Sequence, residues 1–239
     1  MRVIITKDYE ELGKLTTQIL LGTMFAKQDR CNLSITAGKT PLEVYKQLIP
    51  EVKNKKYFNH VHYYNFDEIP YRTEKRPGIT MRDLNKMFFN QAEINKTNIH
   101  PLTETNYAQQ DAKIADAGGI DLMLLGIGKD GHFCGNLPGT TTYEDWTTRV
   151  EFSPAAKERS SVLFEEKKET PDYYVTMGPQ SVMHARQLVL IANGIQKAEI
   201  MKVFLEGKVN PKYPATILKM HPNLTVILDK EAASLLEKD

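Results

Sequence analysis

Residues 32–48 read NLSITAGKTPLEVYKQL, and the order of residue types in this stretch indicates the fold. Asn32–Ala37 is a mostly apolar run of strand length, Gly38 permits a tight turn, and Pro41–Leu48 has the apolar spacing of a helix. Proline is favoured at the first helical position, so Pro41 marks the expected start of the helix. The stretch therefore predicts a buried strand that passes through one turn directly into a helix.

The same order of strands and helices continues on both sides of this stretch. Further strands are predicted at Val3–Thr6, Val61–Phe66, Asp121–Gly126, Gln187–Ala192 and Leu224–Asp229, and further helices at Asp8–Lys27, Arg82–Phe89, Tyr107–Ala117, Pro179–Ala185 and Gln196–Leu205. Most of the strands are continuously apolar, as strands buried on both faces of a parallel sheet are. This alternation predicts an α/β fold with an open, mostly parallel, doubly wound, Rossmann-like sheet, in a single domain over residues 1–239.

One segment, residues 153–172, interrupts this order. It carries prolines near both ends, Pro154 and Pro171, and is rich in Lys and Glu. Because strands and helices resume on both sides, we interpret it as an insertion into the domain and not as a linker between domains. Long loops of compact domains often close over sites, so the segment is predicted to be a lid; a simply solvated loop is the alternative.

The composition of the chain argues against several classes of protein. The 239 residues carry 31 Lys plus Arg against 30 Asp plus Glu, so the chain lacks the basic excess that nucleic-acid binding requires. It also lacks an apolar run of about 18 residues that could cross a membrane, and its N-terminal residues do not form a signal peptide. Cys31 and Cys134 suit reduced thiols. We expect a cytoplasmic protein that binds a small molecule, with no nucleic-acid or membrane partner, no cofactor and no metal. Whether copies of the chain form a homo-oligomer is left open.

The turn Gly38-Lys39-Thr40 is the first candidate ligand site. A turn between a strand and a helix directs free backbone N–H groups and the positive end of the helix dipole to one place, which suits a phosphate. Lys39 adds a cation and Thr40 a hydroxyl. Thr40 and Glu43 also match a capping box. Capped turns of this kind are common without a ligand, so both interpretations stay open at this point.

Two carboxylates, Asp67 and Glu68, follow the strand predicted at residues 61–66. Ligands of open α/β sheets bind beyond the carboxyl ends of the strands, so these side chains lie where chemistry is expected. Only one of two adjacent residues is expected to face the site. In the alternative interpretation, Asp67 caps or bonds a loop amide.

A glycine-rich loop that holds Asp130 and His132 follows the strand predicted at residues 121–126. Histidine titrates near neutral pH, and a neighbouring carboxylate can fix its tautomer and raise its pKa, as general acid/base chemistry requires. We interpret this pair as functional.

Three other polar side chains were considered as ligands. Lys197 begins a predicted helix, where its charge opposes the helix dipole unless an anion is bound nearby. His60 and His62 alternate along a strand and could bind a metal, but no third ligand is evident, so no metal site is predicted.

These pieces, in this order, resemble the superfamily of glucosamine-6-phosphate deaminases/isomerases and 6-phosphogluconolactonases. The likeness covers nearly the whole chain, from the turn at residues 36–41 to residues 218–222, and the Asp130-Gly131-His132 segment with Asn136-x-Pro138-Gly139 is a specific part of it. Within the superfamily the chain looks closest to a bacterial group of glucosamine- or galactosamine-6-phosphate isomerases.

The resemblance implies a role for each candidate residue. The Gly38-Lys39-Thr40 turn and Lys197 would hold the 6-phosphate of a sugar. Asp67 would be the base that moves a proton between C2 and C1 during aldose–ketose isomerisation. His132, oriented by Asp130, would open the pyranose ring through the ring oxygen.

One position departs from the deaminase pattern. Deaminases carry Asn-Glu-Pro where this chain has Asn136-Leu137-Pro138, and the missing carboxylate belongs to their histidine-centred relay. The lactonases lack it too, but they place Arg directly after Asp-Glu, where this chain has Ile69. The resemblance thus implies isomerisation of a hexosamine 6-phosphate, with deamination left open. A 6-phosphogluconolactone-type lactone hydrolase is one alternative, and a non-catalytic sugar-phosphate-binding regulator is another.

Overall fold

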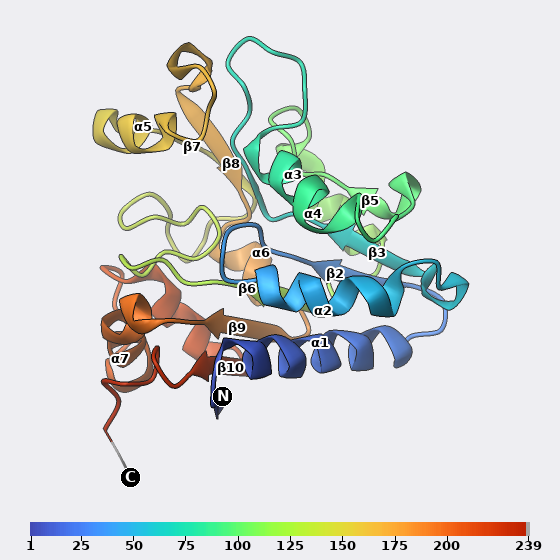
Figure 1. Cartoon of the computed structure of the whole chain (residues 1–239). Helices are drawn as coiled ribbons and strands as arrows, with labels where there is room; N and C mark the ends of the chain where they lie inside the picture. Colours follow the sequence, from blue (N-terminus) through green and yellow to red (C-terminus); the bar gives the residue numbers. More distant parts are fainter. Residues whose placement is uncertain (238–239) are drawn as a thin grey trace.

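The main sheet of the computed structural model, which describes residues 1–237, has seven strands in the order β1-β10-β9-β6-β2-β3-β5 (Figure 1). Every neighbouring pair in this sheet is parallel. Its strands are β1 (Arg2–Thr6), β2 (Cys31–Ser34), β3 (Val61–Tyr64), β5 (Ile99–His100), β6 (Leu122–Leu125), β9 (Leu188–Ala192) and β10 (Leu224–Asp229). The α/β class and the mostly parallel sheet predicted from the sequence are confirmed.

Helices cover both faces of this sheet. They are α1 (Tyr9–Phe25), α2 (Leu42–Val52), α3 (Ile79–Leu84), α4 (Tyr107–Asp116), α6 (Pro179–Met183) and α7 (Ala198–Glu206), and a π-helical turn (Asn85–Phe89) continues α3. The remaining α-helix, α5 (Pro154–Ser161), lies away from this sheet. One apolar core joins α1, α2 and the α3 region to one face, and a second core joins α4, α6 and α7 to the other. Successive residues of a strand point to opposite faces, so Leu122 and Leu124 enter the first core and Met123 and Leu125 the second. This arrangement explains the continuously apolar strands.

A second, smaller sheet was not predicted. It consists of β4 (Asp67–Glu68), β8 (Tyr173–Thr176) and β7 (Thr148–Glu151), paired antiparallel in that order. Residues 153–172 connect β7 to β8 and contain helix α5, whose N-terminus is capped by the Ser153 side chain. In Figure 1 this sheet and α5 lie above the layer of the main sheet. That the whole chain is one domain, and that residues 153–172 are a lid, stay predictions.

The predicted capping box at the start of α2 is wrong. The helix begins at Leu42, one residue later than predicted, so Pro41 takes the capping position and no side chain caps the helix. Tyr9 of α1 replaces the box, because its hydroxyl accepts a hydrogen bond from the Glu43 N–H at 3.0 Å and donates one to the Thr40 carbonyl at 2.9 Å. The turn is therefore held by a residue distant in the sequence.

Within residues 1–237, the longest apolar stretches of helix are too short to cross a membrane. Cys31 and Cys134 are both free thiols.

Candidate active site

A cavity of about 490 Å³ lies beyond the carboxyl ends of the central strands. The loops that follow β2, β3, β6 and β9, which are neighbours in the main sheet, all contribute to its wall. This is the edge at which open α/β sheets bind ligands, and the volume is ordinary for a small-molecule site. Six of the seven predicted site residues line the cavity: Gly38, Lys39, Thr40, Asp67, His132 and Lys197. The seventh, Asp130, lies behind His132.

Asp67 and Glu68 point to opposite sides of β4, as adjacent residues of a strand do. Asp67 lines the cavity, whereas Glu68 is only 2% exposed. The Glu68 carboxylate accepts hydrogen bonds from the backbone N–H groups of Ile69, Thr80 and Met81. The amide-binding role that sequence analysis considered for Asp67 therefore belongs to Glu68.

The environment of Asp67 favours a base that works near neutral pH. Its Oδ1 atom accepts a hydrogen bond from the Thr80 hydroxyl at 3.1 Å. Burial raises the pKa of Asp67 from 3.8 to about 6, against the opposing effects of the Thr80 bond and of His132. A carboxylate with this pKa is ionised at pH 7 and still basic enough to accept a proton from carbon in an activated substrate.

His132 and Asp130 form a hydrogen-bonded pair. The His132 Nδ1 atom lies 2.6 Å from Asp130 Oδ1, and the hydrogen bond to His132 lowers the pKa of Asp130 to about 2. An ionised Asp130 accepts the Nδ1 proton and leaves Nε2 as the ring nitrogen that can exchange a proton with a ligand. The close approach requires glycine at residue 128, because a Cβ atom there would lie 2.1 Å from His132 Nδ1.

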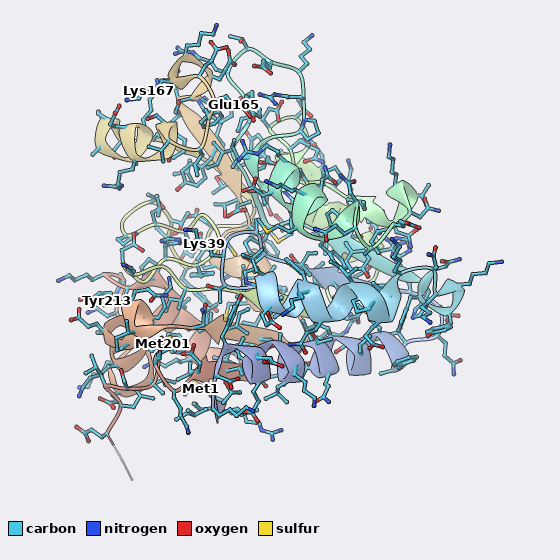
Figure 2. All side chains as sticks on the ribbon, in the orientation of Figure 1. Met1, Lys39, Glu165, Lys167, Met201 and Tyr213 are labelled. Carbon is cyan, nitrogen blue, oxygen red and sulfur yellow. The ribbon has the colours of Figure 1, made fainter. Side chains whose placement is uncertain are left out.

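Part of the cavity wall is cationic. Lys39 follows Gly38, whose φ of 94° suits glycine, and Figure 2 shows Lys39 between the main sheet and the part of the chain that carries Glu165 and Lys167. Lys197 donates a hydrogen bond to the Ile127 carbonyl. Burial lowers the pKa of Lys197, and the charge of Lys129 lowers it further. Clustered lysines beside a strand-to-helix turn suit a dianionic phosphate.

Sequence analysis did not single out several further cavity residues as site residues, among them Thr80, Asp83, Lys129, Cys134 and Leu163. Lys129 and Cys134 belong to the glycine-rich loop already singled out, so their position in that loop could have indicated them. Thr80 and Asp83 belong to α3, and no spacing in the sequence connects that helix with the strand ends.

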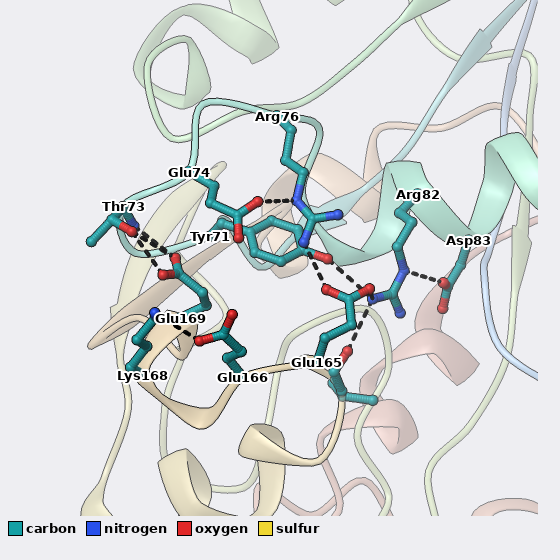
Figure 3. A network of polar contacts seen from close by, with 11 residues as sticks. Tyr71, Thr73, Glu74, Arg76, Arg82, Asp83, Glu165, Glu166, Lys168 and Glu169 are labelled. Carbon is teal, nitrogen blue, oxygen red and sulfur yellow. Dashed lines mark hydrogen bonds and ion pairs between the residues drawn. The ribbon is translucent and has the colours of Figure 1, made fainter.

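Residues 153–172 reach the cavity through Leu163, and polar contacts fasten this segment to residues 71–82 (Figure 3). The Arg82 Nη1 atom donates to the Leu163 carbonyl at 3.0 Å and to the Tyr71 hydroxyl at 3.2 Å. Arg76 lies 2.7 Å from Glu165. Such pairs at the surface contribute little free energy each. That the segment is a lid stays a prediction.

His60 and His62, which sequence analysis weighed as metal ligands and did not assign to a site, have different partners. His60 bonds the Met24 carbonyl, while His62 Nδ1 lies 2.9 Å from His100 Nε2 on the neighbouring strand β5. In the part of the chain that the structure describes, no three His, Cys, Asp or Glu side chains are grouped so that they could bind a metal ion.

Sequence comparison connects this geometry with known enzymes. The family model described as glucosamine-6-phosphate isomerases/6-phosphogluconolactonase matches residues 10–227. The glucosamine-6-phosphate deaminase of Clostridium botulinum (strain Langeland / NCTC 10281 / Type F) is 34% identical over 244 aligned residues, which cover 99% of each chain.

Comparison with solved structures agrees. A monomeric glucosamine-6-phosphate deaminase has a TM-score of 0.83 and 27% identity, and the match covers 98% of this chain and 100% of that one. The 6-phosphogluconolactonase of Trypanosoma cruzi has a TM-score of 0.75 at 18% identity, covering 99% of this chain and 97% of that one. The latter likeness concerns the fold alone.

Proposed function

The chain belongs to the family of glucosamine-6-phosphate isomerases and 6-phosphogluconolactonases, and we propose that it is the member that interconverts the aldose and ketose forms of a hexosamine 6-phosphate. The relatives matched in the comparisons are enzymes, and this chain is an enzyme as well. One observation supports the choice of reaction: Asp67 and His132 line the same cavity as the Gly38-Lys39-Thr40 turn and Lys197, which we call the lysine-flanked turn. A base, a second proton carrier and a phosphate site are the three elements that the isomerisation of a phosphosugar requires.

Binding would begin with the phosphate group. The dianion would contact Lys39, Lys197 and the backbone of the Gly38 turn, all on the cationic wall. Holding the phosphate there places the sugar across the cavity, with its reactive end directed toward Asp67 and His132. Fixing a substrate at its unreactive end in this way converts binding free energy into correct orientation.

Proton transfers at His132 and Asp67 would follow. His132 Nε2 donates a proton to the ring oxygen and accepts the proton that the C1 hydroxyl loses, so the pyranose opens to the C1 aldehyde. Asp67 then removes the C2 proton, the electrons of the C–H bond form a C1=C2 double bond, and His132 Nε2 passes its proton to the aldehyde oxygen. Return of the proton to C1 completes the isomerisation. With an amino group on C2, the product is a ketimine, and attack of water on it would release ammonia.

The finer identity of the substrate is also part of the proposal. Glucosamine 6-phosphate and galactosamine 6-phosphate differ only at C4, and both are candidates. Because Leu137 stands where deaminases carry Glu, we propose that isomerisation proceeds while ammonia release is slower than in the deaminases. The reaction is proposed to take place in the cytoplasm, as expected from the composition.

One alternative activity also fits a specific observation. Lactonases of the superfamily lack the same carboxylate as this chain, and they use their histidine as a base on water. The Asp130–His132 pair, with Nε2 available, could activate water against a 6-phosphogluconolactone-type ester. The lysine-flanked turn would hold the phosphate of either substrate.

A direct assay separates these activities. Purified protein would be supplied with glucosamine 6-phosphate, galactosamine 6-phosphate or 6-phosphogluconolactone, while ketose, ammonia and acid are measured separately. Exchange of the C2 hydrogen of either amino sugar with solvent deuterium supports the proposed isomerisation. Ketose appears together with an equal amount of ammonia, so the ratio of ammonia release to C2 exchange measures how far Leu137 slows hydrolysis of the ketimine. Acid release from the lactone alone would transfer the assignment to the alternative. Protein with no activity on the two amino sugars would refute the proposed isomerisation.

A further inference from the structure

Two neighbouring carboxylates hold the same threonine from two sides. Glu68 Oε1 accepts the backbone N–H of Thr80 at 2.8 Å, and Asp67 Oδ1 accepts the hydroxyl of Thr80 at 3.1 Å. The first contact lies beneath β4, at a residue that is 2% exposed, and the second lies at the wall of the cavity. Thr80 itself is 7% exposed. Thr80 therefore links the orientation of Asp67 to the Glu68 carboxylate, which does not line the cavity.

The junction is built tightly. Besides Thr80, Glu68 also binds the N–H groups of Ile69 and Met81, so the first turn of α3 is fastened to β4 through one carboxylate. Residue 78 has to be glycine, because a Cβ atom there would lie 2.5 Å from Glu68 Oε1 and 2.6 Å from the Ile69 carbonyl oxygen. A backbone held this closely leaves the Thr80 side chain little freedom to move away from Asp67.

We propose that Thr80, fastened by Glu68, is a positioning residue for proton transfer: its hydroxyl fixes the Asp67 carboxylate in the orientation in which it receives the C2 proton. This deepens the proposed function, since it rests on Asp67 being the base. A carboxylate on a short strand next to an open cavity can rotate about its side-chain bonds. A rotation that displaces the oxygen atom receiving the proton by a fraction of an ångström lowers the rate. One bond to Oδ1 removes this rotation while the carboxylate stays basic.

The Thr80 hydroxyl also changes the pKa of Asp67. The bond from Thr80 favours the ionised form of Asp67, and so it lowers a pKa that burial raises. The titratable groups that surround Asp67 are Glu68 on β4, Tyr174 on β8, and His132 and Cys134 on the glycine-rich loop. Removing the Thr80 hydroxyl leaves these four groups in place.

The central test compares Thr80→Val with Thr80→Ser. Valine keeps the shape and the backbone N–H but loses the donor, whereas serine keeps the donor. Carboxyl carbon NMR would follow the titration of Asp67, identified by the signal that is absent in Asp67→Asn. In Thr80→Val we expect the titration midpoint to rise by about 0.5 to 1 pH unit, the value of one hydrogen bond. Thr80→Ser should return it to the wild-type value. An unchanged midpoint in Thr80→Val overturns the proposal.

Turnover gives the second readout. With a hexosamine 6-phosphate deuterated at C2, Thr80→Val should lower kcat about tenfold and increase the deuterium isotope effect, while KM changes by less than about twofold. The matched control is Thr16→Val, which removes another buried hydroxyl, bonded to the Leu12 carbonyl within α1. This control should lose thermal stability without a change in kcat or isotope effect. Equal kinetic effects of both variants overturn the positioning role.

The role of Glu68 needs a readout of its own. In Glu68→Gln, hydrogen exchange at the Thr80 and Met81 amides should accelerate at least about tenfold, since the amide side chain cannot accept from both oxygen positions. Unchanged exchange in a folded Glu68→Gln protein overturns this link. The NMR and exchange measurements require no substrate. A wild-type protein that turns over no phosphosugar would therefore refute the proposed function only. The NMR and exchange results would still support or overturn the coupling of Glu68 and Thr80 to Asp67.

Discussion

Asp67 and Asp130 belong to the same site, yet the two carboxylates occupy different environments. Asp67 lies on a two-residue strand in the wall of the cavity, and burial raises its pKa to about 6. Asp130 lies on a loop with its side chain 49% exposed, and the hydrogen bond to His132 lowers its pKa to about 2. Burial without a cationic partner makes a carboxylate more basic, and a partner in water-accessible surroundings makes it less basic.

This difference assigns the two residues different tasks. A carboxylate that stays ionised at every physiological pH cannot usefully exchange protons, but it can fix the tautomer of a histidine. A carboxylate with a pKa close to the working pH can take up a proton and return it. The site therefore obtains a base and an orienting group from one residue type by changing only the surroundings.

The largest effect is expected from removing the base. Asp67→Asn should lower kcat for hexosamine 6-phosphate isomerisation by about 10³-fold or more, because no other proposed group takes the C2 proton. Binding of the phosphosugar, measured by calorimetry, should persist. The exposed Asp116→Asn on α4 is the matched control and should behave as wild type. Turnover of Asp67→Asn at the wild-type rate would remove Asp67 as the base and with it the contrast between the two aspartates.

Removing the orienting group should have a smaller effect. Asp130→Asn still offers an oxygen to His132 Nδ1 but has no charge to hold the proton there, and so we expect kcat to fall about 10²-fold. The midpoint of the acid-side step in the pH–rate profile should not change, because it is determined by the pKa of Asp67. A midpoint of the acid-side step that shifted in Asp130→Asn as far as it shifts in Thr80→Val would show that Asp67 and Asp130 do not have separate functions.

The two substitutions should change stability in opposite directions. The pKa of Asp67 is higher in the folded state than its ordinary value of 3.8, so its contribution to stability is present below pH 3.8 and is lost as the pH rises through about 6. At pH 7.5, Asp67→Asn should therefore be more stable than wild type by about 2 kcal/mol. Asp130 has a lowered pKa, and its contribution is present at pH 7.5 and lost toward pH 2.

Because Asp130 is half exposed, solvent weakens the contribution of its hydrogen bond to His132, and Asp130→Asn should destabilise the protein only slightly. Urea unfolding of both variants at pH 7.5 is the measurement. A destabilised Asp67→Asn protein would show that the carboxylate is not held in an unfavourable environment in the free enzyme.

The part of the molecule that sequence could predict is the part with local signals. The strand and turn at residues 32–40 and the loop around His132 carry their information in consecutive residues, so four of the six predicted residues that line the cavity, Gly38, Lys39, Thr40 and His132, could be named from them. The second sheet carries no such signal. Its strand β4 has two residues, and its register is set by Thr176 and Val175, more than a hundred positions away in the chain.

Two errors have the same physical origin. The capping box at Thr40 is absent because Tyr9, on another helix, bonds the turn in its place. Thr80 escaped notice because only the folding of β4 against α3 brings its hydroxyl to Asp67. Contacts between elements override local preferences when the partner is rigid and buried, and no single-sequence pattern reports which partner will be near.

The smallest expected effect concerns the pH dependence of the wild-type enzyme. The base has to be ionised to accept the C2 proton, so kcat/KM should fall as the pH drops through about 6, the pKa of Asp67 in the free enzyme, and should be about tenfold lower at pH 5 than at pH 7.5. Asp130 stays ionised through this range, since its pKa is about 2. The profile should thus show one acid-side titration step and not two. Circular dichroism at each pH would confirm that the fold persists. A kcat/KM that stays constant down to pH 4 would show that Asp67 has the ordinary pKa of an exposed aspartate. The environments of the two carboxylates would then not differ in the way that their burial indicates.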